Sequence, residues 1–407
     1  MGRSEKTKSR VLAHQKMINP DLFINKKNWN RLIRSWKNTK LPHALLFHGP
    51  DGSGKEGHAV ELAALLNCTA LRDEEPCGIC PSCKQTKSFQ HGNVKLILPL
   101  PRGKIKSSDD PVTNAFSESV LKEYLDMLKE KEADPYYSIR VPGANTILIN
   151  SIRELKHDVS LSTVNNEWRV ILIFQAEKLC IPSPEAAHAL LKVLEEPPER
   201  TLFILVSSQP RAILDTIHSR CQSIYFPPIS TEILQEQLHQ SGADSVQALV
   251  IARISGGNVR LSRELMKNSI DLMEKLYILL NACFSIDPSI WNKCIDTTAR
   301  LKTKDISQME QLFHCAVLFF RDLLYYTATD TDDEIIFKTQ INKIDKLSKT
   351  YSDADWHSCI QHIENTQNYI SRNGYLPLQM ICMILDIQRS LKGEIYEPFQ
   401  LRNWTPV

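Results

Sequence analysis

The sequence lacks the features of a membrane protein, a secreted protein or a strongly charged protein. No apolar run approaches the ~20 residues that a membrane-spanning helix needs. The first ten residues are basic and polar, and no apolar core follows them, so we expect no secretory signal. The 49 Lys and Arg residues nearly balance the 47 Asp and Glu residues, and the net charge of +2 gives no global reason to expect nucleic-acid binding. We therefore expect a cytoplasmic protein without membrane contact.

The cysteines do not indicate a disulfide framework. There are eleven, an odd number, in a chain for which we expect no export. Four of them fall within residues 68–83 and need their own explanation. The others are scattered and mostly flanked by apolar residues, so we interpret them as small core residues: Cys180, Cys221, Cys283, Cys294, Cys315, Cys359 and Cys382.

The order of apolar runs predicts an α/β domain at the start of the chain. At 407 residues the chain is long enough for two or three domains. Up to Pro228, short apolar runs alternate with helical patterns, which is typical of a parallel sheet. Three runs have the length and composition of strands that are buried on both faces: residues 44–47, 170–174 and 201–206. Helices are predicted at about 60–67 and 186–194.

The rest of the chain is predicted to be helical or irregular. Within the α/β domain (21–228), residues 99–145 form a polar, Pro-containing insertion with one helix at about 118–131. Beyond Pro227–Pro228 we find no convincing strand, only helical spacing of apolar residues. The predicted divisions are a basic N-terminal extension, the α/β domain, a small helical lid, a larger helical domain and a tail: 1–20, 21–228, 229–270, 271–393 and 394–407.

A phosphate-binding loop is predicted between the first apolar run and the following helix. The segment 49–55 fits the pattern G-x-x-x-x-G-K, with Gly49, Gly52, Gly54 and Lys55 as the residues that would surround phosphate. Glycines let backbone N–H groups turn toward phosphate oxygens, and Lys55 adds a positive charge. The alternative is an ordinary glycine-rich turn. The strand before the loop and the helix after it favour the phosphate loop.

Two departures predict that this loop does not support ATP hydrolysis. The pattern normally ends in Ser or Thr, whose hydroxyl binds Mg²⁺, but Glu56 stands there. Two like charges ~4 Å apart repel by about 4 kcal/mol near a protein surface, so Glu56 disfavours hydrolysis without excluding it. The strand 170–174 should lead into Asp-Glu, yet Phe174 and Gln175 can neither hold a metal nor accept a proton. Glu177, further on, is interpreted as a helix-start residue.

The four clustered cysteines predict a metal site. Cys68, Cys77, Cys80 and Cys83 follow the spacing C-x8-C-x2-C-x2-C, and two-residue spacers place successive sulfurs around one ion. Thiolates favour zinc, and four protein ligands leave no open position, so the site should be structural. An iron–sulfur cluster is the alternative, because it can use similar spacing.

These motifs together resemble the AAA+ clamp-loader family of bacterial DNA polymerase III. The resemblance runs from about Leu41 to Arg260 and rests on the lead-in LPHALLFHGP, the four-cysteine module (68–83), the stretch ALLKVLEEPP (189–198) and Ser219-Arg220-Cys221. It implies an AAA+ core with a zinc module, a helical lid and an all-α oligomerising collar. In that family, the absence of Ser/Thr after Lys55 and of Asp-Glu at the strand end is similar to the delta-prime class and unlike the gamma/tau ATPases.

The resemblance also implies roles for individual residues. Arg220 would be an arginine finger that reaches ATP on a neighbouring subunit, where it stabilises the charge of the transferring phosphate. A structural arginine that caps a turn is the alternative. Ser207 and Ser208 lie in the region of the first sensor, and Arg260 resembles the second sensor. The implied partners are the gamma/tau ATPase and delta subunits of a pentameric ring, with the sliding clamp and primed DNA reached through the complex.

A basic segment near the start has two interpretations. Between residues 22 and 50 there are six Lys or Arg residues and no acidic residue before Asp51, with Trp29 and Trp36 interleaved. The segment is either a phosphate-contacting patch or a solvated helix face whose tryptophans pack inward, and we prefer the second. Two rival functions are an active gamma/tau-like ATPase, which needs metal ligands that this chain lacks, and a zinc-dependent DNA-binding protein.

Overall fold

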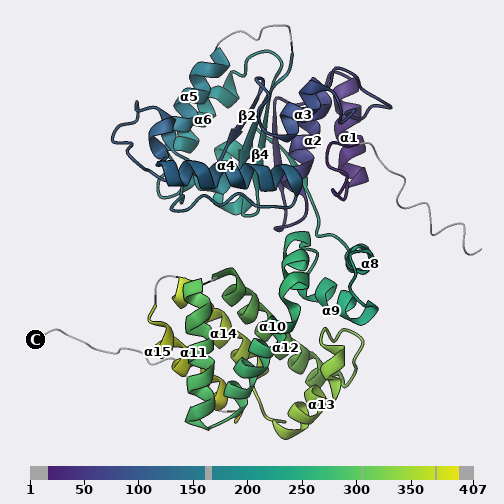
Figure 1. The fold of residues 1–407 in the computed structure, drawn as a ribbon, viewed down its shortest axis with the longest axis vertical. Helices are drawn as coiled ribbons and strands as arrows, with labels where there is room; N and C mark the ends of the chain where they lie inside the picture. Colours follow the sequence, from purple (N-terminus) through teal and green to yellow (C-terminus); the bar gives the residue numbers. More distant parts are fainter. Residues whose placement is uncertain (1–16, 161–166, 305, 372–373, 394–407) are drawn as a thin grey trace, which may run out of the picture. The chain divides into compact units, whose positions relative to one another are not determined.

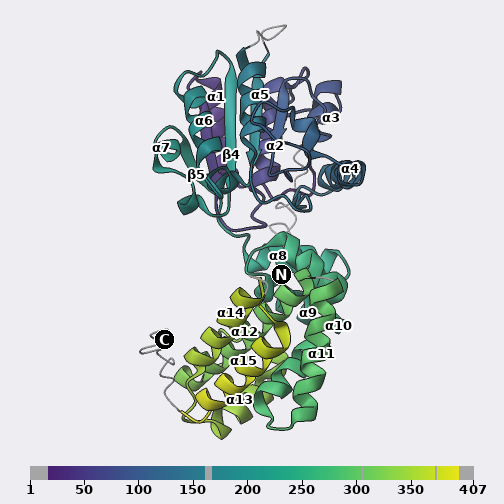
Figure 2. The same ribbon diagram turned by 90° about the vertical axis from the view of Figure 1, so that its left-hand side faces the viewer.

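The chain divides into two compact units. The computed structural model describes residues 17–160, 167–304, 306–371 and 374–393, so most of the predicted N-terminal extension and the whole predicted tail lie outside the described residues. The first unit runs to Ser230 and also includes Gly257–Arg260, while the second contains Thr231–Gly256 and the chain from Leu261 onward. Figures 1 and 2 show a sheet with helices in the first unit and helices in the second.

The first unit is built on a five-stranded parallel sheet. Its strands are β1 (Ala44–His48), β2 (Val94–Ile97), β3 (Arg169–Phe174), β4 (Thr201–Ser207) and β5 (Gln222–Tyr225), in the order β2-β3-β4-β1-β5. The three predicted strands are confirmed as the central β1, β3 and β4. The short edge strands β2 and β5 were not predicted from the sequence. Edge strands are less completely buried, so their sequences lack the continuous apolar run that marks a central strand.

Helices cover both faces of this sheet, which confirms the α/β fold. Successive residues of a strand point to opposite faces. Leu45 and Phe47 pack into one hydrophobic core, and Ala44 and Leu46 pack into the other. The first core is covered by α1 (Lys26–Lys37), α2 (Lys55–Asn67) and α3 (Pro81–Lys87), and the second by α5 (Ile149–Ser160) and α6 (Glu185–Glu195) (Figure 1).

The basic segment is a surface helix with its tryptophans turned inward. In α1, Trp29 is buried and Trp36 is half-buried against the core, whereas the basic side chains of the segment are exposed. Asn25 caps the helix, because its side chain accepts a hydrogen bond from the backbone N–H of Asn28 at 3.0 Å. The tryptophans therefore pack inward as the second interpretation predicts, while the exposed basic side chains fit both interpretations.

The insertion packs onto the sheet domain. It contains η2 (Val112–Ala115) and α4 (Glu118–Ala133), the helix that the sequence predicts at about 118–131. Ile105, Ala115, Ile139 and Val141 are buried in the same core as Leu45 and Phe47. The insertion is thus anchored by apolar burial and belongs to the first unit.

A buried carboxylate, Glu61, holds the start of the described chain against α2. Its two oxygens accept backbone hydrogen bonds from Asn19 at 2.7 Å and from Ile18 at 3.2 Å. Burial raises the pKa of Glu61 from its ordinary value of 4.5 to about 7, although these hydrogen bonds oppose the shift. Between these two pH values, Glu61 is therefore protonated in the folded protein and ionised in the unfolded chain.

This linkage predicts a pH-dependent stability that a single substitution removes. Between pH 4.5 and 7 the raised pKa of Glu61 should cost the wild type up to about 3 kcal/mol of unfolding free energy as the pH rises. The variant Glu61→Gln has no such titration, so its stability relative to wild type should increase over this range. Urea unfolding of both proteins at pH 5 and pH 7.5 measures the difference. Parallel pH profiles would contradict the prediction.

The second unit is helical. Its elements are α8 (Thr231–Gln240), α9 (Ser245–Ser255), most of α10 (Val259–Phe284), α11 (Pro288–Lys304), α12 (Ile306–Thr329), η5 (Lys338–Gln340), α13 (Ile341–Thr350), α14 (Trp356–Ser371) and α15 (Leu376–Ser390). No strand occurs among its described residues, as the sequence predicts. Buried Asp322 on α12 accepts hydrogen bonds from the backbone of Ile336 at 2.9 Å and Phe337 at 2.8 Å, which fixes the chain before α13.

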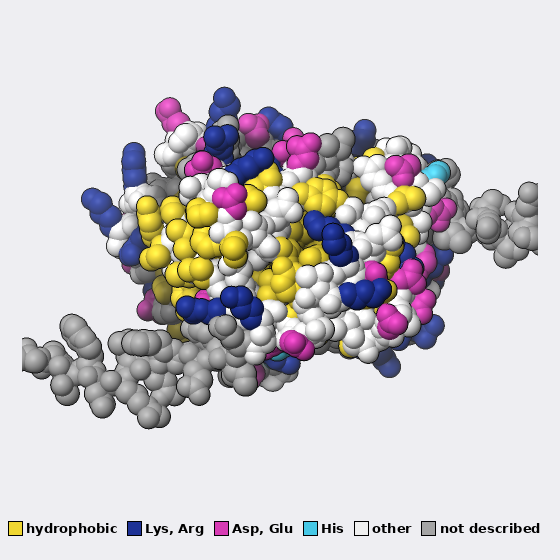
Figure 3. Space-filling model, turned by 90° about the horizontal axis from the view of Figure 1, so that it is seen from below, with side chains coloured by type: hydrophobic (Ala, Val, Ile, Leu, Met, Phe, Trp, Pro, Cys, Tyr) yellow, Lys and Arg dark blue, Asp and Glu magenta, His cyan; other side chains and the backbone are white. Residues whose placement is uncertain are grey.

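Part of the surface of the second unit is apolar. Figure 3 shows hydrophobic side chains gathered on one face, and α15 carries exposed Leu378 and Leu385 together with exposed Cys382. Cys382 is thus an exception to the expectation of buried cysteines, and Cys180 is only half-buried. The other five are buried: Cys221, Cys283, Cys294, Cys315 and Cys359. No helix within the described ranges is long and apolar enough to cross a membrane.

Candidate functional site

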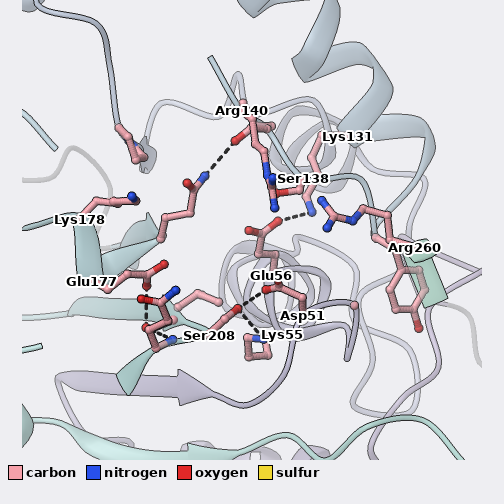
Figure 4. Close-up of a pocket in the computed structure, with 18 of the residues that line it drawn as sticks. Asp51, Lys55, Glu56, Lys131, Ser138, Arg140, Glu177, Lys178, Ser208 and Arg260 are labelled. Carbon is pink, nitrogen blue, oxygen red and sulfur yellow. Dashed lines mark hydrogen bonds and ion pairs between the residues drawn. The ribbon is translucent and has the colours of Figure 1, made fainter. Parts of the chain in front are cut away.

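A pocket lies where the central strands end. Because β1, β3 and β4 are parallel neighbours, the segments that follow them meet at one edge of the sheet, where ligands of such folds bind. The pocket has a volume of about 400 Å³ and is lined by the phosphate loop, the ends of β3 and β4, the insertion and Arg260 (Figure 4). The insertion, for which the sequence suggested no role, supplies a wall of this pocket.

The predicted phosphate loop has the backbone geometry that requires glycine. Gly49, Gly52 and Gly54 have φ angles of +146°, +69° and +82°. A Cβ atom on Gly49 would lie 2.1 Å from the carbonyl oxygen of Phe226, and one on Gly52 would lie 1.9 Å from the side-chain oxygen of Asn258. At Gly49 and Gly52 the loop therefore approaches neighbouring atoms too closely for a side chain.

Lys55 is buried at the start of α2 and bonded to its own loop. Its Nζ atom donates to the carbonyl oxygens of Gly49 at 2.7 Å and Pro50 at 2.6 Å, and lies 3.4 Å from the hydroxyl of Ser208. Burial lowers the pKa of Lys55, while the nearby Asp51 and Glu56 carboxylates oppose the shift. The side chain is therefore held by the carbonyl oxygens of the loop that precedes it.

The positions where an ATPase holds its metal carry other groups. Glu56 forms an ion pair with Lys131 of α4 (Figure 4). Phe174 is the last residue of β3 and is buried, and Lys131 Nζ lies 5.7 Å from the centre of its ring. Gln175 turns away in the left-handed conformation and donates its side-chain amide to the carbonyl oxygen of Ile139 at 2.9 Å. No carboxylate occupies the end of this strand.

Glu177 and Lys131 are among the pocket residues that were not identified from the sequence. Glu177, in the first turn of η3 (Ala176–Cys180), is buried and accepts a hydrogen bond from the hydroxyl of Ser207 at 2.6 Å. Lys131 comes from the insertion, 75 residues along the chain from Glu56. No local motif marks either residue, because their roles depend on contacts between distant segments.

The sensor-region residues lie in or beside this pocket, and Arg220 does not. Ser207, Ser208 and Arg260 line it, and the Ser208 hydroxyl bonds the carboxylate of Asp51. Arg220 lies between α7 (Asp215–His218) and β5, outside the lining.

The contacts of Arg220 are with its own chain. Its guanidinium contacts the carboxylate of Glu195 at 2.5 Å and the carbonyl oxygen of Thr216 at 2.9 Å. About a third of the side chain is exposed.

The four clustered cysteines converge. Their sulfur atoms all lie within 4.8 Å of one another, with Cys68 Sγ 3.9 Å from Cys80 Sγ and Cys77 Sγ 4.0 Å from Cys83 Sγ. Sulfurs at the corners of a tetrahedron around zinc are about 3.8 Å apart, given Zn–S bonds of about 2.3 Å. The residues present therefore fit a four-thiolate metal site.

Two helices position these sulfurs. Cys68 directly follows α2, and Cys80 precedes α3 as its N-cap. Backbone N–H groups point at the sulfurs, with Cys80 N 3.3 Å from Cys77 Sγ and Cys83 N 3.4 Å from Cys80 Sγ. Because α2 is 13 residues long, the cluster lies about 20 Å from the phosphate loop at the other end of that helix, which suits a structural metal.

Comparisons with known proteins agree with this arrangement. The chain is 27% identical over 237 residues to the DNA polymerase III subunit delta' of Bacillus subtilis, which covers 58% of this chain and 57% of that protein. It is 23% identical over 370 residues to the subunit tau of the same organism, covering 82% of this chain and 57% of that protein. The delta' subunit of Yersinia pestis is 27% identical over 235 residues, 56% of each chain. The chain thus spans little more than half the length of each of these relatives.

A protein-family model matches most of the residues of the first unit. The model described as "DNA polymerase III, delta subunit" matches residues 24–230, half of this chain, and these residues contain the sheet, the phosphate loop, the cysteine cluster and Arg220. The chain therefore belongs to the DNA polymerase III delta subunit family and has the AAA+ fold of the clamp-loader subunits of that polymerase.

Proposed function

We propose that this protein is a clamp-loader subunit of the delta-prime class, which does not hydrolyse ATP itself and contributes Arg220 to the ATP site of a neighbouring subunit. The observation that carries the proposal is the pairing of Glu56 with Lys131 beside Phe174. A phosphoryl-transfer site needs a metal that bridges phosphate oxygens and a residue that orients the nucleophile. Here an ammonium, a phenyl ring and a carboxamide stand at those positions.

The accessible arginine supports a role in a neighbouring site. Arg220 lies outside the pocket of its own chain, and about a third of its side chain is exposed. An arginine that acts on another subunit must be reachable from outside. The Glu195 carboxylate holds the guanidinium in one orientation, which lowers the entropy cost of presenting it.

The proposed partners are gamma/tau-type ATPase and delta subunits in a pentameric ring, which acts in the cytoplasm and loads the sliding clamp on primed DNA. The exposed apolar side chains of the second unit suit a protein contact, since large exposed apolar patches mark interaction surfaces. We propose that residues 229–270 form the helical lid and residues 271–393 the collar of the ring. The four-cysteine cluster would hold structural zinc, because thiolates favour zinc and all four positions are filled by protein.

The isolated chain should show no ATP turnover. Lys55→Ala is the matched control, because it removes the phosphate-loop cation and would abolish any genuine hydrolysis at this site. We expect identical background rates for the wild type and the variant in the presence of Mg²⁺. Turnover that disappears in Lys55→Ala would instead identify an active gamma/tau-like ATPase.

A DNA titration of the same preparation tests the other rival function. Tight DNA binding by the lone chain with a steep salt dependence would favour a DNA-binding protein. We expect weak binding or none.

A further inference from the structure

The insertion places one buried lysine inside the phosphate-loop pocket (Figure 4). Lys131, in the last turn of α4, is 3% exposed. An ammonium group has three N–H donors. Those of Lys131 reach the carboxylate of Glu56, the carbonyl oxygen of Pro135 at 2.9 Å and that of Tyr137 at 2.6 Å. Three oxygens therefore hold this cation in one place.

The Lys131 ammonium lies where phosphate-loop enzymes bind their metal ion. Glu56 occupies the position whose hydroxyl binds Mg²⁺ in phosphate-loop proteins. Phe174 ends the strand that carries the metal-binding carboxylate in such enzymes. Lys131 contacts both residues, so a cation that belongs to the chain stands between the two positions that would otherwise share a divalent ion.

The ion pair is a fixed part of the fold. The side chain of Lys131 is 2% exposed and that of Glu56 is 20% exposed. Removing one partner of a buried pair leaves the other charge uncompensated and is strongly destabilising, so each residue depends on the other. Glu56 is consequently neutralised without a metal, which removes the repulsion that it would exert on phosphate.

The remaining charges of the pocket favour an anion. Four further cationic side chains line it, against two carboxylates besides Glu56. The cations are Lys55, Arg140, Lys178 and Arg260, and the carboxylates are Asp51 and Glu177. The volume of about 400 Å³ lies within the usual range for small-molecule sites. A polyphosphate matches both the excess of positive charge and the glycine-lined loop.

We propose that this pocket binds a nucleoside polyphosphate without a divalent metal ion, with the Lys131 ammonium in the place of the metal. The inference deepens the proposed function, since it assigns a ligand to a site whose lack of hydrolysis that function assumes. An ammonium that already donates to three oxygens cannot also coordinate a phosphate and a nucleophile as Mg²⁺ does. The ligand is therefore held intact and would stabilise the first unit.

The test is a calorimetric titration of the full chain with ADP, once with EDTA and once with excess Mg²⁺. We expect the dissociation constants measured with EDTA and with Mg²⁺ to agree within about fivefold. Lys131→Met should weaken binding by about tenfold or more, because it leaves the Glu56 charge facing the phosphates. Lys129→Met is the matched control on an exposed side of α4 and should leave the affinity unchanged.

A double variant keeps the test valid if Lys131→Met alone unfolds the domain. Glu56→Thr combined with Lys131→Met removes both charges and restores the metal-binding hydroxyl, so ADP binding should now strengthen by about tenfold or more with Mg²⁺. No binding of ADP by the wild type at millimolar concentration, a larger than fivefold requirement for Mg²⁺, or a double variant indifferent to Mg²⁺ would each overturn the proposal. ATP turnover by the lone chain would contradict the proposed function instead.

Discussion

Replacing Arg220 by alanine should lower the ATP turnover of the reconstituted clamp loader by about 10³-fold at the site that receives it, the usual contribution of an arginine finger. The physical reason is the charge that develops on the transferring phosphate, which a guanidinium stabilises through two parallel hydrogen bonds. The measurement is steady-state ATP hydrolysis by the assembled complex with clamp and primed DNA. Size-exclusion chromatography checks that the variant still assembles, so that a loss of turnover cannot be caused by loss of the complex.

Two further variants separate this role from a structural one. Arg220 contacts Glu195 and the carbonyl oxygen of Thr216, which is also how an arginine that caps a turn would bind. Glu195→Gln removes the ion pair that orients the guanidinium but leaves the guanidinium itself, so turnover should fall by only about threefold or less. Arg220→Lys keeps the charge without the planar fork and should recover little activity. If Glu195→Gln reproduces the loss, or if Arg220→Ala turns over ATP normally, the finger assignment is wrong.

Removing the zinc ion that we propose for the four-cysteine cluster should unfold the segment 68–83 and destabilise the first unit by several kcal/mol, since binding of structural zinc contributes roughly 10–16 kcal/mol in small zinc domains. Cys83 is fully buried and its sulfur lies 4.0 Å from that of Cys77, so Cys83→Ser should abolish stoichiometric metal binding. Elemental analysis and thermal unfolding, with and without a chelator, measure both effects. Cys382→Ser, at an exposed cysteine in the second unit, is the control and should change neither.

The same measurement distinguishes zinc from an iron–sulfur cluster. Zinc is colourless, whereas a cluster would give visible absorption and iron in the elemental analysis. We expect one zinc ion per chain and no iron. Because thiolates must be deprotonated to bind, release of the metal should also increase as the pH falls. A protein that contains no metal, and that unfolds at the same temperature with and without chelator, would contradict the prediction.

Local patterns in the sequence identified most of the first unit. The runs 44–47, 170–174 and 201–206 are apolar throughout because the central strands are covered by helices on both faces. The spacing of the phosphate loop and of the cysteines is local too, since each motif is built from neighbouring residues. The edge strand β5 was missed because two of its four residues are polar and exposed or half-exposed.

The sequence by itself therefore determined the parallel α/β core, the phosphate loop, the absence of a metal-binding carboxylate at the end of β3 and the convergence of four cysteines. Only the tertiary structure decided what replaces the metal. Lys131 meets Glu56 across 75 residues of chain, through an insertion whose sequence carries no recognisable motif. The physical reason is that such an ion pair forms only when packing brings distant segments together. The residues next to Lys131 or Glu56 in the sequence therefore do not reveal its partner.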